Sequence, residues 1–294
     1  ARVITSLNHG AFFGIGSIVA TSVVPKDKQA SAIAMMFMGL TIANIGGVPL
    51  ATWVGQHIGW RSAFAGIAVL GVITMLSLFK ALPQGSVGQK PDVMQELKVL
   101  TRPAVMLALL TTVMGAGILF TLYTYIAPTL STITHASPTF VTCMLVLVGL
   151  GFSIGNHYGG KFSDQSIDRT LIGFLVVLIV LMGLFPILAK TSIGAAISLI
   201  IFGAATFALV PPLQMRVMSV AHEAPGLASS VNIGAFNLGN ALGAALGGAV
   251  ISLNMGYAAV PVSGAVLAAL TLVLVLVQKR LYQHDHPATC EAAS

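Results

Sequence analysis

Long apolar runs separated by short polar breaks occupy almost the whole chain of 294 residues. A helix needs about 20 apolar residues to cross the hydrocarbon core of a bilayer. Nine runs reach that length between charged or proline breaks, and none alternates polar and apolar residues as a barrel strand does. The pattern predicts an all-α polytopic membrane protein with spans at about 1–24, 29–56, 62–82, 103–128, 138–160, 170–189, 192–215, 226–252 and 256–278.

The composition agrees with burial in lipid. Only 7% of the residues are charged and 56% are hydrophobic, whereas a soluble domain carries about 25% charged residues. The net charge of +6 does not indicate nucleic acid as a partner, because the basic residues form no patch and stand between apolar runs. The two cysteines, Cys143 and Cys290, provide no disulfide framework and no CxxC pair, so we expect no metal and no cofactor.

The basic residues are distributed unequally between alternate loops, which predicts the orientation of the chain. If loop 25–28 faces the cytoplasm, only Arg61 and Lys190 lie outside, and the C-terminus is cytoplasmic. The basic residues then inside are Lys26, Lys28, Lys80, Lys90, Lys98, Arg102, Lys161, Arg169, Arg216, Lys279 and Arg280.

The only extended polar segment inside the chain, residues 83–102, separates three predicted spans from six. A weak repeat crosses it at an offset of 193 residues, where Asn44 meets Asn237 and Gly46 meets Gly239. Repeated halves are common in secondary transporters. We therefore expect residues 1–82 to be helices 4–6 of a first six-helix half, 83–102 a cytoplasmic loop, 103–280 helices 7–12, and 281–294 a cytoplasmic tail. The chain would then carry nine of twelve helices and lack the first three.

Three motifs resemble those of the major facilitator superfamily, in its branch of drug:proton antiporters and arabinose-efflux permeases. They are RxxxSxxHGAFFGIG at 2–16, GLTIANIGGVPLATWVGQHIGWRSAF at 39–64 and GGKFSDQSIDRT at 159–170. The resemblance implies a monomeric transporter of a bacterial inner membrane, which exports a drug, sugar or metabolite by alternating access in exchange for protons. An uptake facilitator and a membrane protein that does not transport are the alternatives. The sequence contains no HExxH motif and no acid within a predicted span, so we expect no enzyme.

Arg2 and His9 are the candidates for proton coupling. An arginine at membrane depth persists only where it faces protein or water, and the resemblance makes Arg2 the arginine that favours deprotonation of a nearby acid. His9 lies two helical turns further on the same face, and histidine is the residue type whose charge can change near neutral pH. The alternatives are that Arg2 only flanks a helix start and that His9 is neutral and bonded to a carbonyl. None of the eight acidic residues lies within a predicted span.

The resemblance also implies an inside gate at Gly160, Asp164 and Arg169, which would hold the outward-open state. The alternative is that Asp164 simply stabilises a helix N-terminus.

Small residues recur every four positions in three predicted spans, and such residues let helix backbones approach closely. The resemblance implies that the first two stripes slide against each other and that the partner of the third lies outside the chain. Gly46, Gly47 and Pro49, like Pro211 and Pro212, predict a kinked or broken helix. The stripes are Gly39, Ala43, Gly47, Ala51 and Gly55; Gly151, Gly155 and Gly159; and Ala235, Gly239, Gly243 and Gly247.

Polar side chains within the spans are the candidates for contact with a substrate, although Asn44 and Asn237 could instead join helices. These candidates are Asn44, Tyr123, Tyr125, Asn156, Gln214, Asn232, Asn237 and Asn240.

Overall fold

The computed structural model describes residues 2–81 and 93–285, and every regular element in these ranges is a helix. A few side chains inside the helices, among them those of Arg2, Asn44 and Pro49, lie outside the described part. The first elements are α1 (Arg2–Ser22), a short 3-10 turn (Lys26–Lys28), α2 (Gln29–Ile42), a π-helical turn (Ala43–Gly47), α3 (Val48–His57) and α4 (Trp60–Ala81). They are followed by α5 (Val93–Leu100), α6 (Pro103–Tyr123), α7 (Ile126–Ile133), α8 (Pro138–Gln165), α9 (Ile167–Leu188), α10 (Ser192–Phe207), α11 (Val210–Val220), α12 (Pro225–Ser252) and α13 (Ala259–Asp285).

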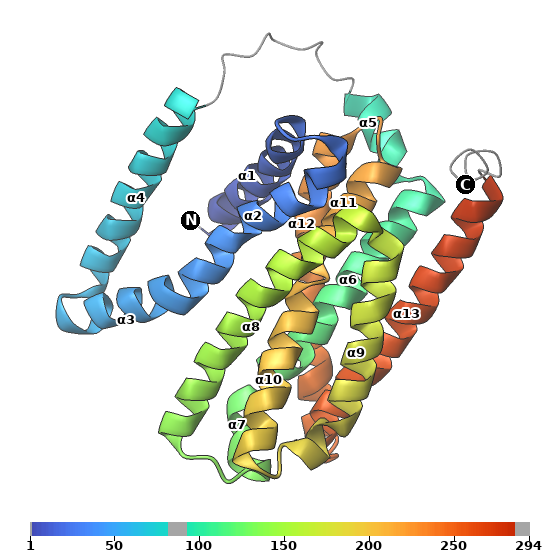
Figure 1. Ribbon diagram of the computed structural model, residues 1–294. Helices are drawn as coiled ribbons and strands as arrows, with labels where there is room; N and C mark the ends of the chain where they lie inside the picture. Colours follow the sequence, from blue (N-terminus) through green and yellow to red (C-terminus); the bar gives the residue numbers. More distant parts are fainter. Residues whose placement is uncertain (1, 82–92, 286–294) are drawn as a thin grey trace.

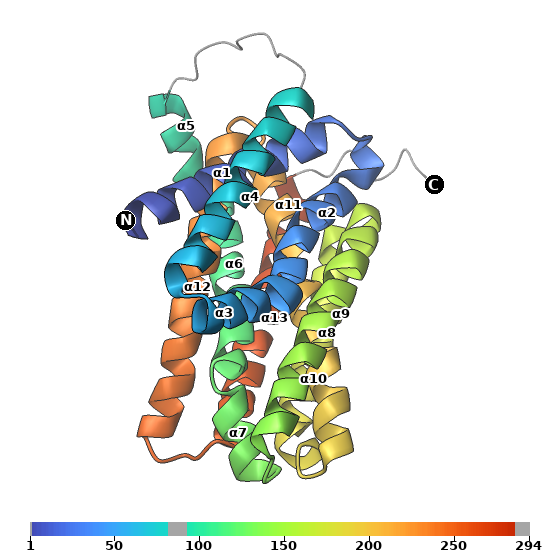
Figure 2. The same cartoon turned by 90° about the vertical axis from the view of Figure 1, so that its left-hand side faces the viewer.

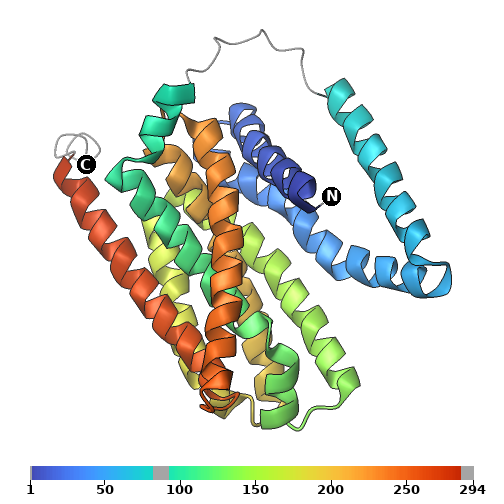
Figure 3. The ribbon, with the colours of Figure 1, turned by 180° about the vertical axis from the view of Figure 1, so that it is seen from behind.

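The helices from α6 onward form a bundle, on which α1 and α2 lie (Figure 1). Within it α6 packs on α12, α8 on α10, and α13 on α6 and α9. Seen from behind, α1 lies beside α12, which it contacts (Figure 3). In contrast, α3 and α4 extend away from the bundle (Figures 1 and 2), and the described side chains of α4 remain almost entirely exposed. We call one end of the bundle the basic end, because Lys26, Lys28, Arg102, Lys161 and Arg169 lie in or beside its helix junctions; it is the upper end in Figure 1.

Eight helical segments within the described residues are long and apolar enough to cross a membrane. They correspond to eight of the nine predicted spans, and the remaining prediction, 1–24, coincides with helix α1. The connection predicted around 161–169 is almost wholly helical, because α8 continues to Gln165 and Ser166 is the single residue before α9 begins. Part of the predicted loop 83–102 is likewise helical, as α5. The division of the chain into two halves stays a prediction.

Proline and glycine interrupt two of the spans, as the sequence predicts. The predicted span 29–56 is broken by the π-helical turn that contains Gly46 and Gly47, and Pro49 stands in the first turn of α3. The predicted span 192–215 divides into α10 and α11, with Pro211 and Pro212 at the start of α11. A proline nitrogen has no hydrogen to donate to a helical hydrogen bond. These prolines therefore stand in the first turns of α3 and α11, where a backbone N–H has no partner within its own helix.

Two of the three small-residue stripes, those of α8 and α12, pack closely, but their partners differ from those expected. A methyl group added to Gly155 would overlap the backbone of Ala204, so the stripe of α8 faces α10 and not α2. A methyl group on Gly243 would overlap the backbone of Gly117, so the stripe of α12 has its partner in this chain, on α6. Both expectations were wrong. The glycines of the first stripe make no close contact of this kind: a methyl group at Gly39, Gly46 or Gly55 would meet nothing within 4 Å.

Candidate functional site

A cavity of about 290 Å³ lies between α1 and α2 on one side and the bundle on the other. The second half of α6, as far as its last residue Tyr123, contributes to the wall with middle parts of α8 and α12, the end of α10 and the start of α11. Its lining residues are His9, Phe37, Leu40, Gly115, Ala116, Leu119, Phe120, Tyr123, Phe152, Thr206, Phe207, Leu209, Val210, Leu213, Ile233, Phe236, Asn237 and Asn240.

Aromatic rings dominate this wall. Phe152 of α8 stacks on Phe207 of α10, with 4.1 Å between the ring centroids, and Tyr123 lies 5.6 Å from Phe152. The polar lining groups are few, and two of them are already bonded within their own helices. The Thr206 hydroxyl donates to the carbonyl of Phe202 at 2.7 Å, and the Asn237 amide donates to the carbonyl of Ile233 at 2.9 Å. The free hydrogen-bonding capacity of the cavity is therefore small.

The predicted substrate contacts divide into two groups. Tyr123, Asn237 and Asn240 line the cavity, and His9 from α1 lines it as well. The other described candidates, Tyr125, Asn156, Gln214 and Asn232, are not among its lining residues. The predictions for Arg2 and Asn44 fall on side chains outside the described part.

The second group of candidates joins helices instead. The Tyr125 hydroxyl donates to the carbonyl of Ala244 at 3.0 Å and so connects the end of α6 to α12. The Asn156 amide donates to the carbonyl of Ala34, which connects α8 to α2. The Tyr125 hydroxyl and the Asn156 amide nitrogen thus have partners on neighbouring helices, as polar side chains in lipid generally do, whereas the buried carbonyl oxygen of Asn156 has no partner among the described residues.

Gln214 is the centre of a buried polar cluster between α1, α11 and α12. Its amide nitrogen donates to the hydroxyls of Ser17, at 3.3 Å, and Ser229. Its carbonyl oxygen accepts from the amide of Asn232 at 2.7 Å. Gln214, Ser17, Ser229 and Asn232 are all fully buried. The cluster therefore fixes α1 against the bundle next to the cavity.

Asp164 lies in the last turn of α8 and binds the N-terminus of α2. Its carboxylate accepts from the backbone N–H of Ala30 at 2.8 Å, from the N–H of Ser31 at 3.2 Å, and from the Ser31 hydroxyl. A negative charge at this position both caps the helix and complements its dipole. Gly160 allows the contact, because a methyl group there would meet the side chain of Ala34.

The third residue of the predicted gate lies elsewhere. Arg169 stands in the first turn of α9, and its backbone N–H donates to the Ser166 hydroxyl at 3.3 Å. Its exposed side chain lines a shallow groove between α8 and α9 with Phe162 and Phe174. Arg169 is therefore not part of the contact that Asp164 makes with α2.

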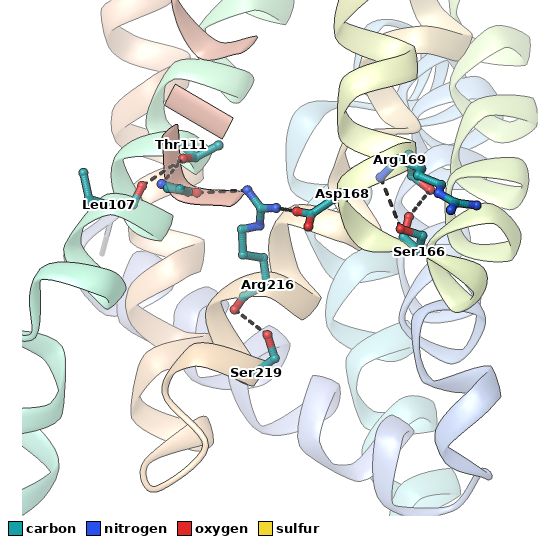
Figure 4. Close-up of polar contacts among 9 residues, drawn as sticks. Leu107, Thr111, Ser166, Asp168, Arg169, Arg216 and Ser219 are labelled. Carbon is teal, nitrogen blue, oxygen red and sulfur yellow. Dashed lines mark hydrogen bonds and ion pairs between the residues drawn. The ribbon is translucent and has the colours of Figure 1, made fainter. Parts of the chain in front are cut away.

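Arg216 forms a buried ion pair that the sequence analysis missed (Figure 4). The guanidinium group, whose side chain is 6% exposed, pairs with Asp168 of α9 and donates to the Gln278 carbonyl oxygen of α13 at 2.9 Å. The Gln278 amide donates in turn to the Thr111 hydroxyl of α6 at 2.8 Å. This network joins four helices of the bundle near its basic end. The sequence analysis placed Arg216 among the basic residues on the cytoplasmic side. Its position one helical turn after two prolines, at the end of an apolar run, is a signal that could have indicated a buried partner.

Arg102 and Glu223 form an exposed ion pair at the same end. The two guanidinium nitrogens of Arg102 donate to the two carboxylate oxygens of Glu223 at 3.1 and 2.7 Å. The hydrogen bond from Arg102 lowers the pKa of Glu223 below its ordinary value. The pair connects the α5–α6 junction to the α11–α12 junction.

Two further kinds of chemistry concern the described residues, namely metal binding and catalysis by a nucleophilic serine. No group of three or more His, Cys, Asp or Glu side chains in this part of the chain could hold a metal ion. Residues 151–155 read GFSIG and match the spacing of the GxSxG nucleophile motif, which the sequence analysis overlooked. They lie inside helix α8 instead of in a strand–turn–helix elbow, and the Ser153 hydroxyl donates to the hydroxyl of Thr41 at 3.1 Å. This serine therefore joins α8 to α2 and is not placed as a nucleophile.

Comparison with known proteins gives consistent matches along the chain. A family model described as Major Facilitator Superfamily matches residues 1–233. The "Inner membrane transport protein YdhP" of Escherichia coli (strain K12) is 66% identical over 280 residues, which are 95% of this chain and 72% of that protein. The "Putative transporter AraJ" of the same strain is 33% identical and is matched over 91% of this chain and 68% of its own. The crystal structure of the transporter FucP "in the outward conformation" has a TM-score of 0.70 at 14% identity, covering 90% of this chain and 71% of that one.

Proposed function

The chain belongs to the major facilitator superfamily, whose members are membrane transporters and not enzymes, and we propose that it exports a small molecule by alternating access in exchange for protons. The single observation that carries the proposal is the cavity between α1–α2 and the bundle, closed on the side of the basic end by hydrogen bonds that join α2 to α8 and α1 to α11. A transporter of this kind must hold its substrate between two bodies that move relative to each other.

The connections indicate which side of the cavity is closed. Asp164 and Asn156 join α8 to α2, and Gln214 joins α11 to α1, all between the cavity and the basic end. Beyond the cavity in the other direction, α3 departs from the bundle (Figures 1 and 2). This arrangement supports an outward-facing state, as does the likeness to a structure whose title states the outward conformation.

The charge distribution supports the orientation that this requires. Lys26, Lys28, Arg102, Lys161 and Arg169 cluster at the basic end, and the positive-inside rule assigns that end to the cytoplasm. The last turns of α13 lie at the same end (Figure 1), which supports a cytoplasmic C-terminus. The relative named an inner membrane transport protein supports the inner membrane of a bacterium as the location.

Asp164 has a mechanistic role in this proposal. To expose the cavity to the cytoplasm, α2 must separate from α8, which breaks the bonds of the carboxylate to Ala30 and Ser31. Hydrogen bonds to a charged group contribute about 1.5–3 kcal/mol each. Two conformations of a transporter differ by only a few kcal/mol, so a contact of this size is sufficient to favour one of them.

Proton coupling is assigned to His9, with Arg2 as its neighbour on the same helix. His9 lines the cavity, where a change of its charge would act directly on a bound substrate. An uptake or efflux facilitator without coupling is the second candidate. It is favoured by a specific observation: the described residues that line the cavity include no carboxylate that could carry a proton.

The test is proton movement in liposomes. The protein is reconstituted, a pH gradient is imposed, and a pH-sensitive dye reports proton release as each compound of a panel is added. Coupled export predicts release with at least one compound, and loss of that release in His9→Gln. His157→Gln, on the exposed surface of α8, is the matched control and should retain it. Equilibration of a labelled compound without proton release would overturn coupling and establish the facilitator.

A further inference from the structure

The lining of the cavity limits the chemistry of what it binds. If the cavity is the transport site of the proposed function, we infer that its substrate is an aromatic weak acid of one or two rings. Neither a free sugar nor a lipophilic cation fits the same lining. The inference follows from the rings in the wall, from the positions of the acidic residues, and from the few polar groups that remain free.

The aromatic rings that line the cavity come from five helices. Phe37, Phe120, Tyr123, Phe152, Phe207 and Phe236 line the cavity. Aromatic pairs in stacked or edge-to-face contact contribute about 0.5–1.5 kcal/mol each beyond the burial of their area. A planar substrate in contact with several of these rings therefore gains affinity that an aliphatic one of the same size does not.

A sugar fits poorly, because it carries a hydroxyl on almost every carbon. Among the polar side-chain groups described as lining the cavity, His9, Tyr123, Asn240 and the amide oxygen of Asn237 make no hydrogen bond with another described residue. Burying a hydroxyl without a partner costs about 1–3 kcal/mol. Several such hydroxyls against an aromatic wall would offset the whole gain from burial.

A cation lacks a counter-charge. The described acidic side chains, Asp27, Glu96, Asp164, Asp168 and Glu223, all belong to helix ends or junctions on the side of the basic end. Three of them are already bonded, to the N-terminus of α2, to Arg216 and to Arg102. Cation–π contact contributes about 0.5–2 kcal/mol. Removing an ion from water is costly for a carboxylate and for a cation alike, and the rings alone do not compensate for it. A carboxylate would gain hydrogen bonds donated by His9 and Asn240, whereas a cation would find no counter-charge among the described lining residues.

The remaining polar groups suit the oxygens of an acid. The ring of His9 in α1 and the amide of Asn240 in α12 both line the cavity, and neither makes a hydrogen bond with any described residue. Both can donate to a carboxylate or phenolate oxygen, whether or not the histidine is charged. A volume of about 290 Å³ lies at the lower limit of ordinary ligand sites, which suits one or two fused rings.

Equilibrium binding to the purified full chain in detergent tests the inference without any need for transport. Labelled naphthoate is the probe, and three unlabelled competitors change its rings, its charge or both. Decalin carboxylate keeps the charge without the aromatic rings, naphthylmethylammonium keeps the rings with the opposite charge, and arabinose replaces both with hydroxyls. We expect naphthoate to bind at least tenfold more tightly than any of the three.

Variants assign the binding to this cavity. Phe152→Leu should weaken naphthoate binding about tenfold, since one strong ring contact is worth up to about 1.5 kcal/mol. Phe162→Leu, on the exposed face of the same helix, should leave it unchanged. Asn240→Ala should weaken binding of naphthoate more than binding of naphthalene. Thermal unfolding of each variant shows that it is folded.

The inference is overturned if the cation or the sugar binds as tightly as naphthoate, or if Phe162→Leu weakens binding as much as Phe152→Leu does. Its failure is distinct from failure of the proposed function. Selective naphthoate binding without proton release in liposomes would retain the substrate class and reject coupling. Proton release with a cation or a sugar, in a protein that does not bind naphthoate, would retain coupling and reject the substrate class.

Discussion

Asp164 and Asp168 are close in the sequence, yet they stabilise different contacts. Asp164 ends α8 and holds α2, whereas Asp168 begins α9 and neutralises Arg216 inside the bundle. The single-residue break at Ser166 separates the two roles, because the direction of the chain changes there. We therefore expect Asp168 to contribute to the stability of the fold and Asp164 to the balance between conformations.

Replacement of Asp168 by alanine should destabilise the protein by about 3 kcal/mol. Removing one partner of a buried ion pair costs about 3–5 kcal/mol, and the lower end applies because Asp168 is itself 35% exposed. Thermal unfolding in detergent measures the effect. Asp27→Ala, at an exposed position of the 3-10 turn, is the control and should change little. Equal melting temperatures for the two variants would show that the stability of the fold does not depend on the pairing of Arg216 with Asp168.

Arg102→Gln should raise the pKa of Glu223 toward its ordinary value of 4.5, because the hydrogen bond from Arg102 is the largest cause of its lowering. A carboxyl group whose pKa is lower in the folded state stabilises the fold above the ordinary pKa. That contribution is lost as the pH falls through the lowered value. Carbon NMR titration of labelled glutamate measures the shift, with Lys98→Gln as the control. An unchanged pKa in Arg102→Gln would contradict the pairing.

Helix positions could be predicted from the sequence, because the thickness of the hydrocarbon sets the length of each apolar run. The predictions 103–128, 170–189 and 226–252 closely match α6, α9 and α12. The boundary at residue 160 was too early, because α8 continues into polar residues once it has left the hydrocarbon. Helix partners could not be predicted. A stripe of glycines shows that something packs closely, but which helix does so depends on the whole bundle.

The same limit applies to the polar residues of the spans. Asparagine and glutamine at membrane depth require a hydrogen-bond partner, which the sequence indicates. Whether the partner is a substrate or a neighbouring helix depends on the direction in which each side chain points. Asn240 faces the cavity, while Asn156 and Gln214 face α2 and α1. Three-dimensional packing therefore separates the cavity residues from those that join helices.

At the level of helix pairs, Gly155→Ala should destabilise the protein by about 1–3 kcal/mol. The new methyl group would overlap the backbone of Ala204, and a backbone cannot move aside as a flexible side chain can. Gly183→Ala, in α9, is the matched control, because nothing lies within 4 Å of the added carbon. It should be neutral or stabilising by up to about 1 kcal/mol, since alanine favours helix. Chemical unfolding of both variants measures the difference; equal stability would reject close packing of α8 on α10.

For the molecule as a whole, alternating access requires α1 and α2 to move relative to the bundle. The described connections between these two parts combine hydrogen bonds and small-residue contacts with an apolar cluster, in which Ile33 and Phe37 of α2 pack with Met218 of α11 and Ile233 of α12. Separation exposes part of this cluster, so the two conformations stay within a few kcal/mol of each other only if new contacts replace those that are lost. A covalent bond between α2 and α8 would remove this freedom.

The pair Thr41→Cys with Ser153→Cys provides that bond. The two hydroxyl oxygens are 3.1 Å apart, so cysteines at these positions place their sulfurs close enough to react on oxidation. Cys143 and Cys290 are first replaced by serine, so that no other thiol competes. Oxidation should abolish transport in liposomes while ligand binding is retained, and a reductant should restore transport. Each single-cysteine variant should transport under both conditions. Undiminished transport by the oxidised, cross-linked protein would show that α2 and α8 do not separate during the cycle, and the alternating-access proposal would then require a different moving boundary.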